Sequence, residues 1–353
     1  MDFLRNRTQQ EHFALWFKDY TPESMAEIIG NTDLVDTLRL YIEVGHIPDI
    51  LLSGPNGTTK KNIARLVAKE YLGGHYEYGH IEIDGSISRG KDNVTNTNDY
   101  KKISTDKLNS EGKNIMTFAK AKISLGGKKK VVIIYNFDYM TIEAQNAMRR
   151  VIELYAKTTR FIFVCNDIDK IIEPIQSRCV PLQTSYLLEK EIIQAMKQVL
   201  TKAGFSPDHV DHNVLKTICM LSGGDLKKAI NYLQVISSSP EPNLDTLYKI
   251  FNIPPVHNII KILDAVSSPT TYQIAYDTLD KLLENGYNSS DILSIFIPTV
   301  ISYDIDLKTK TDYLHALSRC SVKTELAKTN SNLFSLIARL GKIRTDGYEA
   351  DSI

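Results

Sequence analysis

The sequence predicts an α/β domain built on a parallel sheet, followed by two helical regions. Three observations lead to this prediction: short apolar runs alternate with amphipathic segments in the first half, a glycine-rich turn joins one such run to a helix, and apolar residues keep helical spacing through the second half. The 353 residues exceed what one hydrophobic core usually organises. We therefore expect three domains, at residues 1–185, 186–239 and 240–353.

The predicted sheet begins with residues 50–53, an apolar run that enters the turn GPNGTTKK. Residues 62–71 then alternate apolar and basic side chains at helical spacing, so a strand, a loop and a helix follow one another. Two further runs, at 131–134 and 160–165, have the character of buried strands and are separated by a helical stretch. This alternation favours a parallel sheet with helices on both faces.

The remaining segments predict helices and loops. Thr141 is suited to cap the helix between the last two strands, because its hydroxyl can accept a backbone hydrogen bond. Residues 85–113 are polar and predict a loop insertion at the surface. Helical spacing covers 187–236 and resumes at residue 243, and the segment SSSPEP at 237–242 predicts a linker between a small helical lid and a C-terminal bundle.

The composition is that of a soluble globular protein, with 42% hydrophobic and 24% charged residues. Lys plus Arg and Asp plus Glu both number 42, so the chain lacks a general basic excess and any DNA contact must be local. No stretch has the length and apolarity of a signal peptide core or a membrane span. Neither a zinc spacing nor a disulfide framework is formed by the four cysteines, Cys165, Cys179, Cys219 and Cys320.

The glycine-rich turn is an altered phosphate-binding loop. In the pattern G-x-x-x-x-G-K-[ST], backbone N–H groups cradle phosphates, the lysine neutralises their oxygens, and the hydroxyl ligates Mg²⁺. Here Gly54 and Lys60 are kept, whereas Thr59 replaces the second glycine and Lys61 replaces the hydroxyl residue. The predicted phosphate-binding residues are Gly54, Pro55, Asn56, Gly57, Thr58, Thr59, Lys60 and Lys61.

The second half of such a site is also altered. An Asp that holds Mg²⁺ and a Glu that polarises water normally end a neighbouring strand. The strand at 131–134 is followed by Tyr135 and Asn136, and Asp138 further on is interpreted as a helix cap. The loss of the hydroxyl and of both carboxylates argues against Mg²⁺ binding and against hydrolysis in this site, and no other metal site is expected. Weak or metal-independent binding of ATP or ADP stays open, because Lys60 and a helix N-terminus still offer positive potential.

A family resemblance enters at FIFVCNDIDKIIEPIQSRC, residues 161–179, which resembles the sensor-1 strand and SRC motif of replication factor C small subunits. The segments AQNAMRR at 144–150, LWFKDYTP at 15–22 and SGGDLKKAIN at 222–231 resemble the same family. Together the motifs span about residues 15 to 235, and the C-terminal part matches only in length and helical character. The resemblance implies an AAA+ fold with a P-loop sheet domain, a helical lid and a C-terminal helical collar.

The resemblance also implies roles for single residues. Arg178, the arginine of the SRC motif, corresponds to a finger that reaches the nucleotide of a neighbouring subunit; a structural ion-pair role for Arg178 is the alternative. Asn166 and Lys227 fall at nucleotide-contacting positions of the family. Lys227 replaces the usual arginine there, and Thr21 replaces another, which weakens the case for an active site in this chain.

Further residues resemble those through which the family contacts DNA or couples DNA to the ATP site. The alternative for the arginines is that they are surface residues. The predicted DNA-contacting and coupling residues are Arg89, Gln145, Arg149 and Arg150.

The family thus implies a small subunit of a hetero-pentameric clamp loader that helps load a PCNA-type sliding clamp onto primer–template DNA. Its own ATP site would be degenerate, it would have no independent ATPase activity, and it would donate Arg178 to a neighbour, as in the eukaryotic fifth subunit. No membrane is involved. Localisation would be nuclear in a eukaryotic cell, or at a cytoplasmic replication site for a large DNA virus. The alternatives are an active ATPase subunit, or a stand-alone DNA-binding scaffold protein with a relic AAA+ fold.

Overall fold

The computed structural model describes residues 15–19, 21–87, 90, 115–266, 268–327 and 330–346. Packing groups the chain into two compact units, residues 1–209 with 222–234, and residues 210–221 with 235–353. The division into three domains at 1–185, 186–239 and 240–353 stays a prediction. Arg89 and most of the expected loop insertion lie outside the described residues.

The first unit is built on a five-stranded sheet with the order β2-β3-β4-β1-β5, and all neighbouring strands in it are parallel. The strands predicted at 50–53, 131–134 and 160–165 are confirmed to within one residue at each end. The strands are β1 (Ile50–Ser53), β2 (His80–Asp84), β3 (Lys130–Tyr135), β4 (Thr159–Val164) and β5 (Val180–Gln183).

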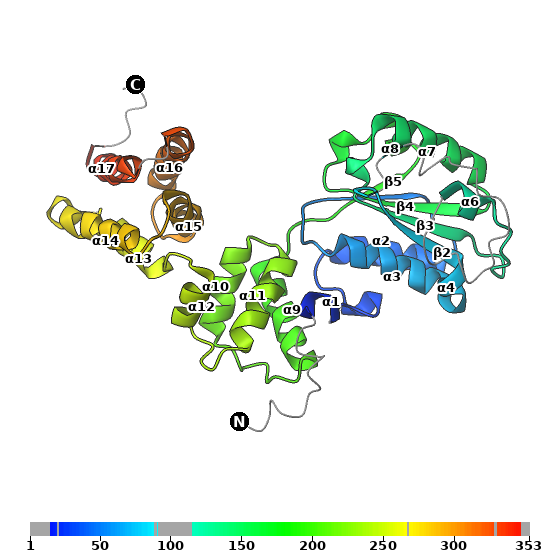
Figure 1. The fold of residues 1–353 in the computed structure, drawn as a ribbon, viewed down its shortest axis with the longest axis horizontal. Coiled ribbons are helices and arrows are strands. Elements are labelled where there is room, and N and C mark those ends of the chain that lie inside the picture. The colour runs from blue at the N-terminus through cyan, green and yellow to red at the C-terminus, as the bar shows by residue number, and fades with distance from the viewer. Residues whose placement is uncertain are drawn as a thin grey trace. The chain divides into compact units, whose positions relative to one another are not determined.

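Helices cover both faces of this sheet (Figure 1). Successive residues of a strand point to opposite faces, and the two cores follow that alternation. Leu51 and Phe163 pack with the helices α6, α7 and α8, whereas Ile50 and Val164 pack with α2 and α3 on the other face. These helices are α2 (Thr32–Glu43), α3 (Lys60–Leu72), α6 (Ile115–Lys120), α7 (Ile142–Tyr155) and α8 (Glu173–Gln176).

The start of α7 is as expected, because the Thr141 hydroxyl accepts a hydrogen bond from the Ala144 N–H at 3.3 Å. The other elements of the first unit are short, apart from α9 and α11. They are α1 (Trp16–Asp19), η2 (Met25–Glu27), η3 (Gly73–His75), α4 (Tyr76–Gly79), η5 (Phe137–Tyr139), η6 (Ile168–Lys170), α9 (Glu189–Lys202) and α11 (Leu226–Ser237), whose last turn belongs to the second unit.

The second unit is helical in its described residues. Apolar side chains of α13 to α17 form one core that includes Phe296 and Tyr313, as the amphipathic spacing after residue 243 predicts. Within the described ranges, none of the helices combines the length and the apolarity that crossing a membrane would need. The elements are α10 (His212–Ser222), α12 (Leu244–Phe251), α13 (Val256–Ala265), η7 (Pro269–Thr271), α14 (Tyr272–Glu284), α15 (Ser289–Ser302), α16 (Leu307–Ala327) and α17 (Ser331–Asp346).

Candidate functional site

A cavity of about 490 Å³ opens where β1, β3 and β4 end. In open parallel sheets, ligands bind at the carboxyl ends of the strands, which is where this cavity lies. The structure brings most of the predicted nucleotide-binding residues together on its wall, whereas Gly54 and Pro55 are not part of the lining. The lining residues are Phe17, Asn56, Gly57, Thr58, Thr59, Lys60, Lys61, Asn62, Asn136, Val164, Cys165, Asn166, Asp225, Lys227, Lys228 and Asn231.

Two glycines let the phosphate loop approach its neighbours closely. Gly54 has φ 139°, and a Cβ there would lie 2.4 Å from the Thr184 carbonyl oxygen. Gly57 has φ 77°, and a Cβ there would lie 2.8 Å from the Cα of Asp225, the residue that caps α11. The Leu226 N–H also donates to the Gly57 carbonyl. The loop is therefore packed between the residue that follows β5 and the start of α11.

Thr59, at the position of the second glycine of the pattern, has a backbone conformation that glycine adopts more readily than other residues. Its φ of 60° and ψ of 10° are left-handed, a region that costs an ordinary residue about 1–2 kcal/mol. Threonine is β-branched, which makes the conformation still less favourable. Its hydroxyl oxygen is buried and has no hydrogen-bond partner. Thr59 thus holds a conformation for which glycine is the better suited residue.

Lys60 is buried beneath the loop, with 6% of the residue exposed. Its ammonium donates to the carbonyl oxygens of Gly54 at 2.6 Å and Pro55 at 2.5 Å. Burial lowers the pKa of Lys60 to about 8, although Cys165, Asp138 and Asp225 act in the opposite direction. The positive charge expected here from the sequence is present, and it is held at the centre of the loop.

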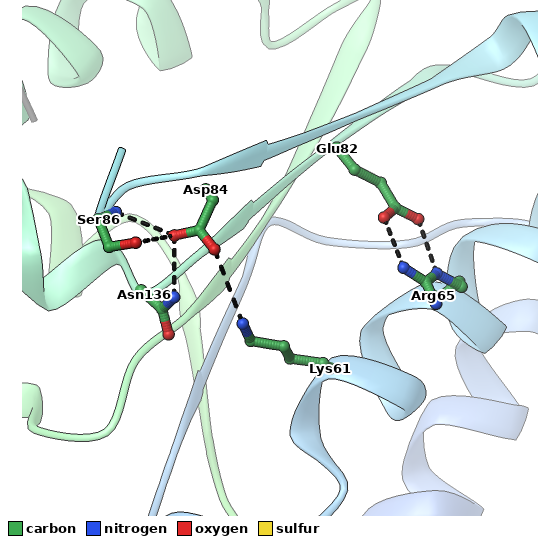
Figure 2. A network of polar contacts seen from close by, with 6 residues as sticks. All are labelled: Lys61, Arg65, Glu82, Asp84, Ser86 and Asn136. Atoms are coloured by element: carbon green, nitrogen blue, oxygen red, sulfur yellow. Dashed lines mark hydrogen bonds and ion pairs between the residues drawn. The ribbon is translucent and has the colours of Figure 1, made fainter. Parts of the chain in front are cut away.

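Lys61 extends from the first turn of α3 toward the end of β2 (Figure 2). Its Nζ lies 3.8 Å from Oδ2 of Asp84 and 5.2 Å from the centroid of the Tyr135 ring. The other oxygen of Asp84 accepts hydrogen bonds from the Ser86 N–H and hydroxyl and from the Asn136 amide, at 2.7 to 2.9 Å. Burial alone would raise the pKa of Asp84, but these hydrogen bonds and Lys61 hold it below its ordinary value.

The residues around the cavity do not fit Mg²⁺. This ion prefers several oxygen ligands in octahedral geometry. Lys61 places a cation where the ligating hydroxyl belongs, Tyr135 is a buried phenol, and the NH₂ group of Asn136 is committed to Asp84. Of the described residues on the cavity wall, Asp225 alone has a carboxylate, and it caps α11. Among the described residues, no group of three or more His, Cys, Asp or Glu could hold a metal ion.

The interpretation of Asp138 as a helix cap is wrong. Thr141 caps α7, and Asp138 lies inside η5, three residues past the end of β3. One of its carboxylate oxygens is buried without a hydrogen-bond partner, and Asp138 is absent from the cavity wall. Its clearest effect is electrostatic, because its charge favours the protonated form of Lys60.

Arg178 lies just after α8 and is not part of the cavity wall. Its Nη2 lies 2.6 Å from Oε1 of Glu153 on α7, and its Nη1 donates to the Pro174 carbonyl at 2.7 Å. Arg149 approaches the same Glu153 oxygen at 3.3 Å. About a third of the Arg178 side chain (34%) remains exposed. Two contacts thus hold the guanidinium at the surface, and Glu153 is a contact that the sequence did not reveal.

Gln145, on α7, is buried and hydrogen-bonds to the backbone of two separate segments. Its amide NH₂ donates to the carbonyls of Met140 and Lys170, and its Oε1 accepts from the Ile172 N–H, all at 3.0 to 3.2 Å. The segment before α7 is thereby joined to the segment that leads into α8. Arg150 is exposed on α7. The coupling and DNA-contacting roles of these residues stay predictions.

A second, smaller hollow of about 60 Å³ adjoins the cavity and shares Phe17, Thr59 and Asn62 with it. Its other walls are mostly apolar and include Ile28 and Ile230. No single residue type marked this hollow in the sequence, although its Phe17 and Thr21 belong to the segment LWFKDYTP. An apolar hollow beside a phosphate loop suits a flat, weakly polar group such as a nucleoside base.

The four cysteines are free and buried, as the sequence predicts. Burial raises the pKa of Cys165, on the cavity wall, to about 12, and that of Cys179 to about 12 as well. Their thiols are therefore protonated at neutral pH and poorly suited to act as nucleophiles.

The chain is similar to proteins of known family. The family model described as DNA polymerase III, delta subunit, matches residues 30–187. The chain is 33% identical to the probable replication factor C subunit 2 of Dictyostelium discoideum, over 92% of this chain and 91% of that protein. It is also 33% identical to replication factor C subunit 2 of Arabidopsis thaliana, over 85% and 84%, and 28% identical to the replication factor C small subunit of Archaeoglobus fulgidus, over 94% and 99%.

Solved structures of RuvB from Thermotoga maritima match 80% of this chain and 90% of their own, with a TM-score of 0.51 at 16% sequence identity. This likeness bears on the fold alone. It confirms the predicted α/β fold of the AAA+ type.

Proposed function

Because the chain belongs to the replication factor C small-subunit family, we propose that it is a non-hydrolysing small subunit of a replication factor C-like clamp loader. In this proposal it helps load a sliding clamp of the PCNA type onto primer–template DNA. It lends Arg178 to the ATP site of a neighbouring subunit, while its own phosphate loop holds nucleotide without cleaving it.

One observation supports the proposal most strongly. The side chains that would bind Mg²⁺ and polarise water are replaced, whereas Arg178 is present and is held by Glu153 and the Pro174 carbonyl. Lys61, Tyr135 and Asn136 stand at the positions of the hydroxyl, the Asp and the Glu. Phosphoryl transfer depends on the metal clamp and on a positioned nucleophile, so losing all three groups removes hydrolysis from this site.

Arg178 is suited to act on a neighbour. Its guanidinium is at the surface, partly exposed, and is oriented by Glu153 and the Pro174 carbonyl. A planar guanidinium can pair with two phosphoryl oxygens at once, and an arginine that reaches a transferring phosphoryl group raises the rate by about 10³-fold or more. The pairing with Glu153 also fits a purely structural role, so the function of Arg178 has to be tested in the assembly.

The expected place of the chain is the end of a hetero-pentameric arc, where its own site faces the gap and Arg178 faces the preceding nucleotide. ATP or ADP would be bound weakly or without metal, with Lys60 beneath the phosphates and the base in the apolar hollow beside Phe17. DNA contact would be made to phosphates by a few local cations, because the chain has no general basic excess.

The first experiment is purification of the tagged full chain from its native source, followed by ATPase assays with DNA and clamp. We expect a five-subunit complex with stimulated hydrolysis, and no Mg²⁺-dependent hydrolysis by the chain on its own. A chain that purifies alone would favour a stand-alone scaffold protein. Hydrolysis by the isolated chain that is abolished by Lys60→Ala would show an active ATPase site.

A further inference from the structure

Two cations of α3 approach strand β2, and the two ion pairs differ (Figure 2). Arg65 meets Glu82 through two hydrogen bonds of 2.9 and 2.8 Å, which fix the helix to the strand. Lys61, one turn earlier, lies 3.8 Å from Asp84, and 53% of its side chain is exposed. A half-exposed ion pair at that distance contributes little to stability. The ammonium can therefore leave Asp84 at small cost, and Asp84 still keeps its three other hydrogen bonds.

Lys61 stands at the position of the phosphate-loop pattern whose hydroxyl would ligate Mg²⁺. It follows Lys60 directly at the N-terminus of α3 and lines the cavity of about 490 Å³. The charged residues on the cavity wall are Lys60, Lys61, Lys227, Lys228 and the single carboxylate Asp225. Asp225 already accepts a hydrogen bond from the Lys228 N–H. With Asp84, which pairs with Lys61, and Asp138, which acts on Lys60, these residues give four cations against three carboxylates, and this positive excess suits a polyphosphate that brings no metal of its own.

We propose that Lys61 takes the place of the divalent cation, so that the chain binds a nucleoside di- or triphosphate as the free anion and Mg²⁺ opposes the binding. The inference rests on the proposed function, in which this cavity holds nucleotide without cleaving it. Mg²⁺ on the phosphates neutralises part of the charge that the lysines attract. It also brings a double positive charge beside the Lys61 ammonium, whereas Asp225 caps α11 and Asp84 already accepts three hydrogen bonds.

The test is calorimetric titration of the full chain with ADP, once in EDTA and once with excess Mg²⁺. We expect the dissociation constant to be about tenfold lower in EDTA, a difference of about 1.4 kcal/mol. Lys61→Met should weaken binding in EDTA by about tenfold and remove most of the difference between the two conditions. Lys61→Arg keeps the positive charge and should retain the preference for EDTA.

The matched control is Lys69→Met, which removes a lysine from the exposed face of the same helix, away from the cavity wall. It should bind ADP as the wild-type chain does, and thermal unfolding of each variant checks that it is folded. Equal or tighter ADP binding with Mg²⁺, an unchanged dissociation constant for Lys61→Met, or no ADP binding in either condition would overturn the inference. None of these results bears on Arg178, whose effect is measured on hydrolysis by the assembled complex.

Discussion

The phosphate-loop cavity and the surface around Arg178 belong to the same unit, but they differ in which side chains of the family pattern are present. Around the cavity, Thr59 is held in a left-handed conformation, and Lys61, Tyr135 and Asn136 stand at the pattern positions of the hydroxyl, the Asp and the Glu. At Arg178, the arginine of the predicted finger is present, and Glu153 and the Pro174 carbonyl hold its guanidinium. Under the proposed function, the packing of a nucleotide site and its chemistry are separable, because different atoms provide the two.

The largest expected effect concerns the geometry of Arg178. In an assembled complex, Arg178→Lys keeps the charge but loses the planar fork, so hydrolysis at the one site that it faces should fall by about 10³-fold. Single-turnover hydrolysis resolves this site from the others as a missing phase. If the complex with Arg178→Lys hydrolyses ATP as fast as the wild type, a positive charge is sufficient at this position. The orientation of the guanidinium by Glu153 would then not be required.

The next effect concerns the charge at the centre of the cavity. The pKa of Lys60 is about 8, and the groups near it are Cys165, Asp138, Asp225 and Lys61. Phosphate favours protonated Lys60, so ADP binding in EDTA should change little between pH 7 and 8 and weaken by up to about tenfold per pH unit above 8, with proton uptake. Cys165, whose pKa is about 12, does not titrate in this window. Titrations from pH 6.5 to 9.5 check this, and a flat profile would contradict it.

The smallest effect concerns the strain stored at Thr59. Thr59→Gly removes a left-handed threonine and a buried hydroxyl without a partner, while the added freedom of the unfolded chain offsets part of the gain. We expect the free energy of unfolding to rise by about 1 kcal/mol in urea denaturation. Thr59→Ala, which removes the hydroxyl but keeps the left-handed strain, should gain less. A destabilised glycine variant would mean that Thr59 makes a favourable contribution to the loop.

The sequence predicted the central strands well and missed the edges. β1, β3 and β4 are fully or almost fully buried, so they read as apolar runs. The edge strands β2 and β5 alternate between covered and more exposed residues, and β5 contains Pro181, which an edge strand tolerates. Short edge strands of mixed polarity look like loops when no neighbouring strand is known.

The candidate site was predictable where it depends on the identity of residues in one segment, and not where it depends on contacts between segments. The altered phosphate loop could be read directly from residues 54–61. The partners of its side chains could not, because Asp84 and Asp225 come from distant parts of the chain. Glu153 likewise meets Arg178 only after α7 and α8 have packed together.

The most direct test of the account is single-turnover ATP hydrolysis by the assembled complex with wild-type chain, with Arg178→Ala, and with Lys197→Ala. Lys197, on α9, lies 3.7 Å from Asp208, and 41% of its side chain is exposed. The Lys197→Ala variant therefore controls for the loss of one surface cation. The account predicts that Arg178→Ala removes one phase of hydrolysis and that Lys197→Ala removes none. An Arg178→Ala complex that retains every phase would contradict the central claim that this chain completes the active site of its neighbour.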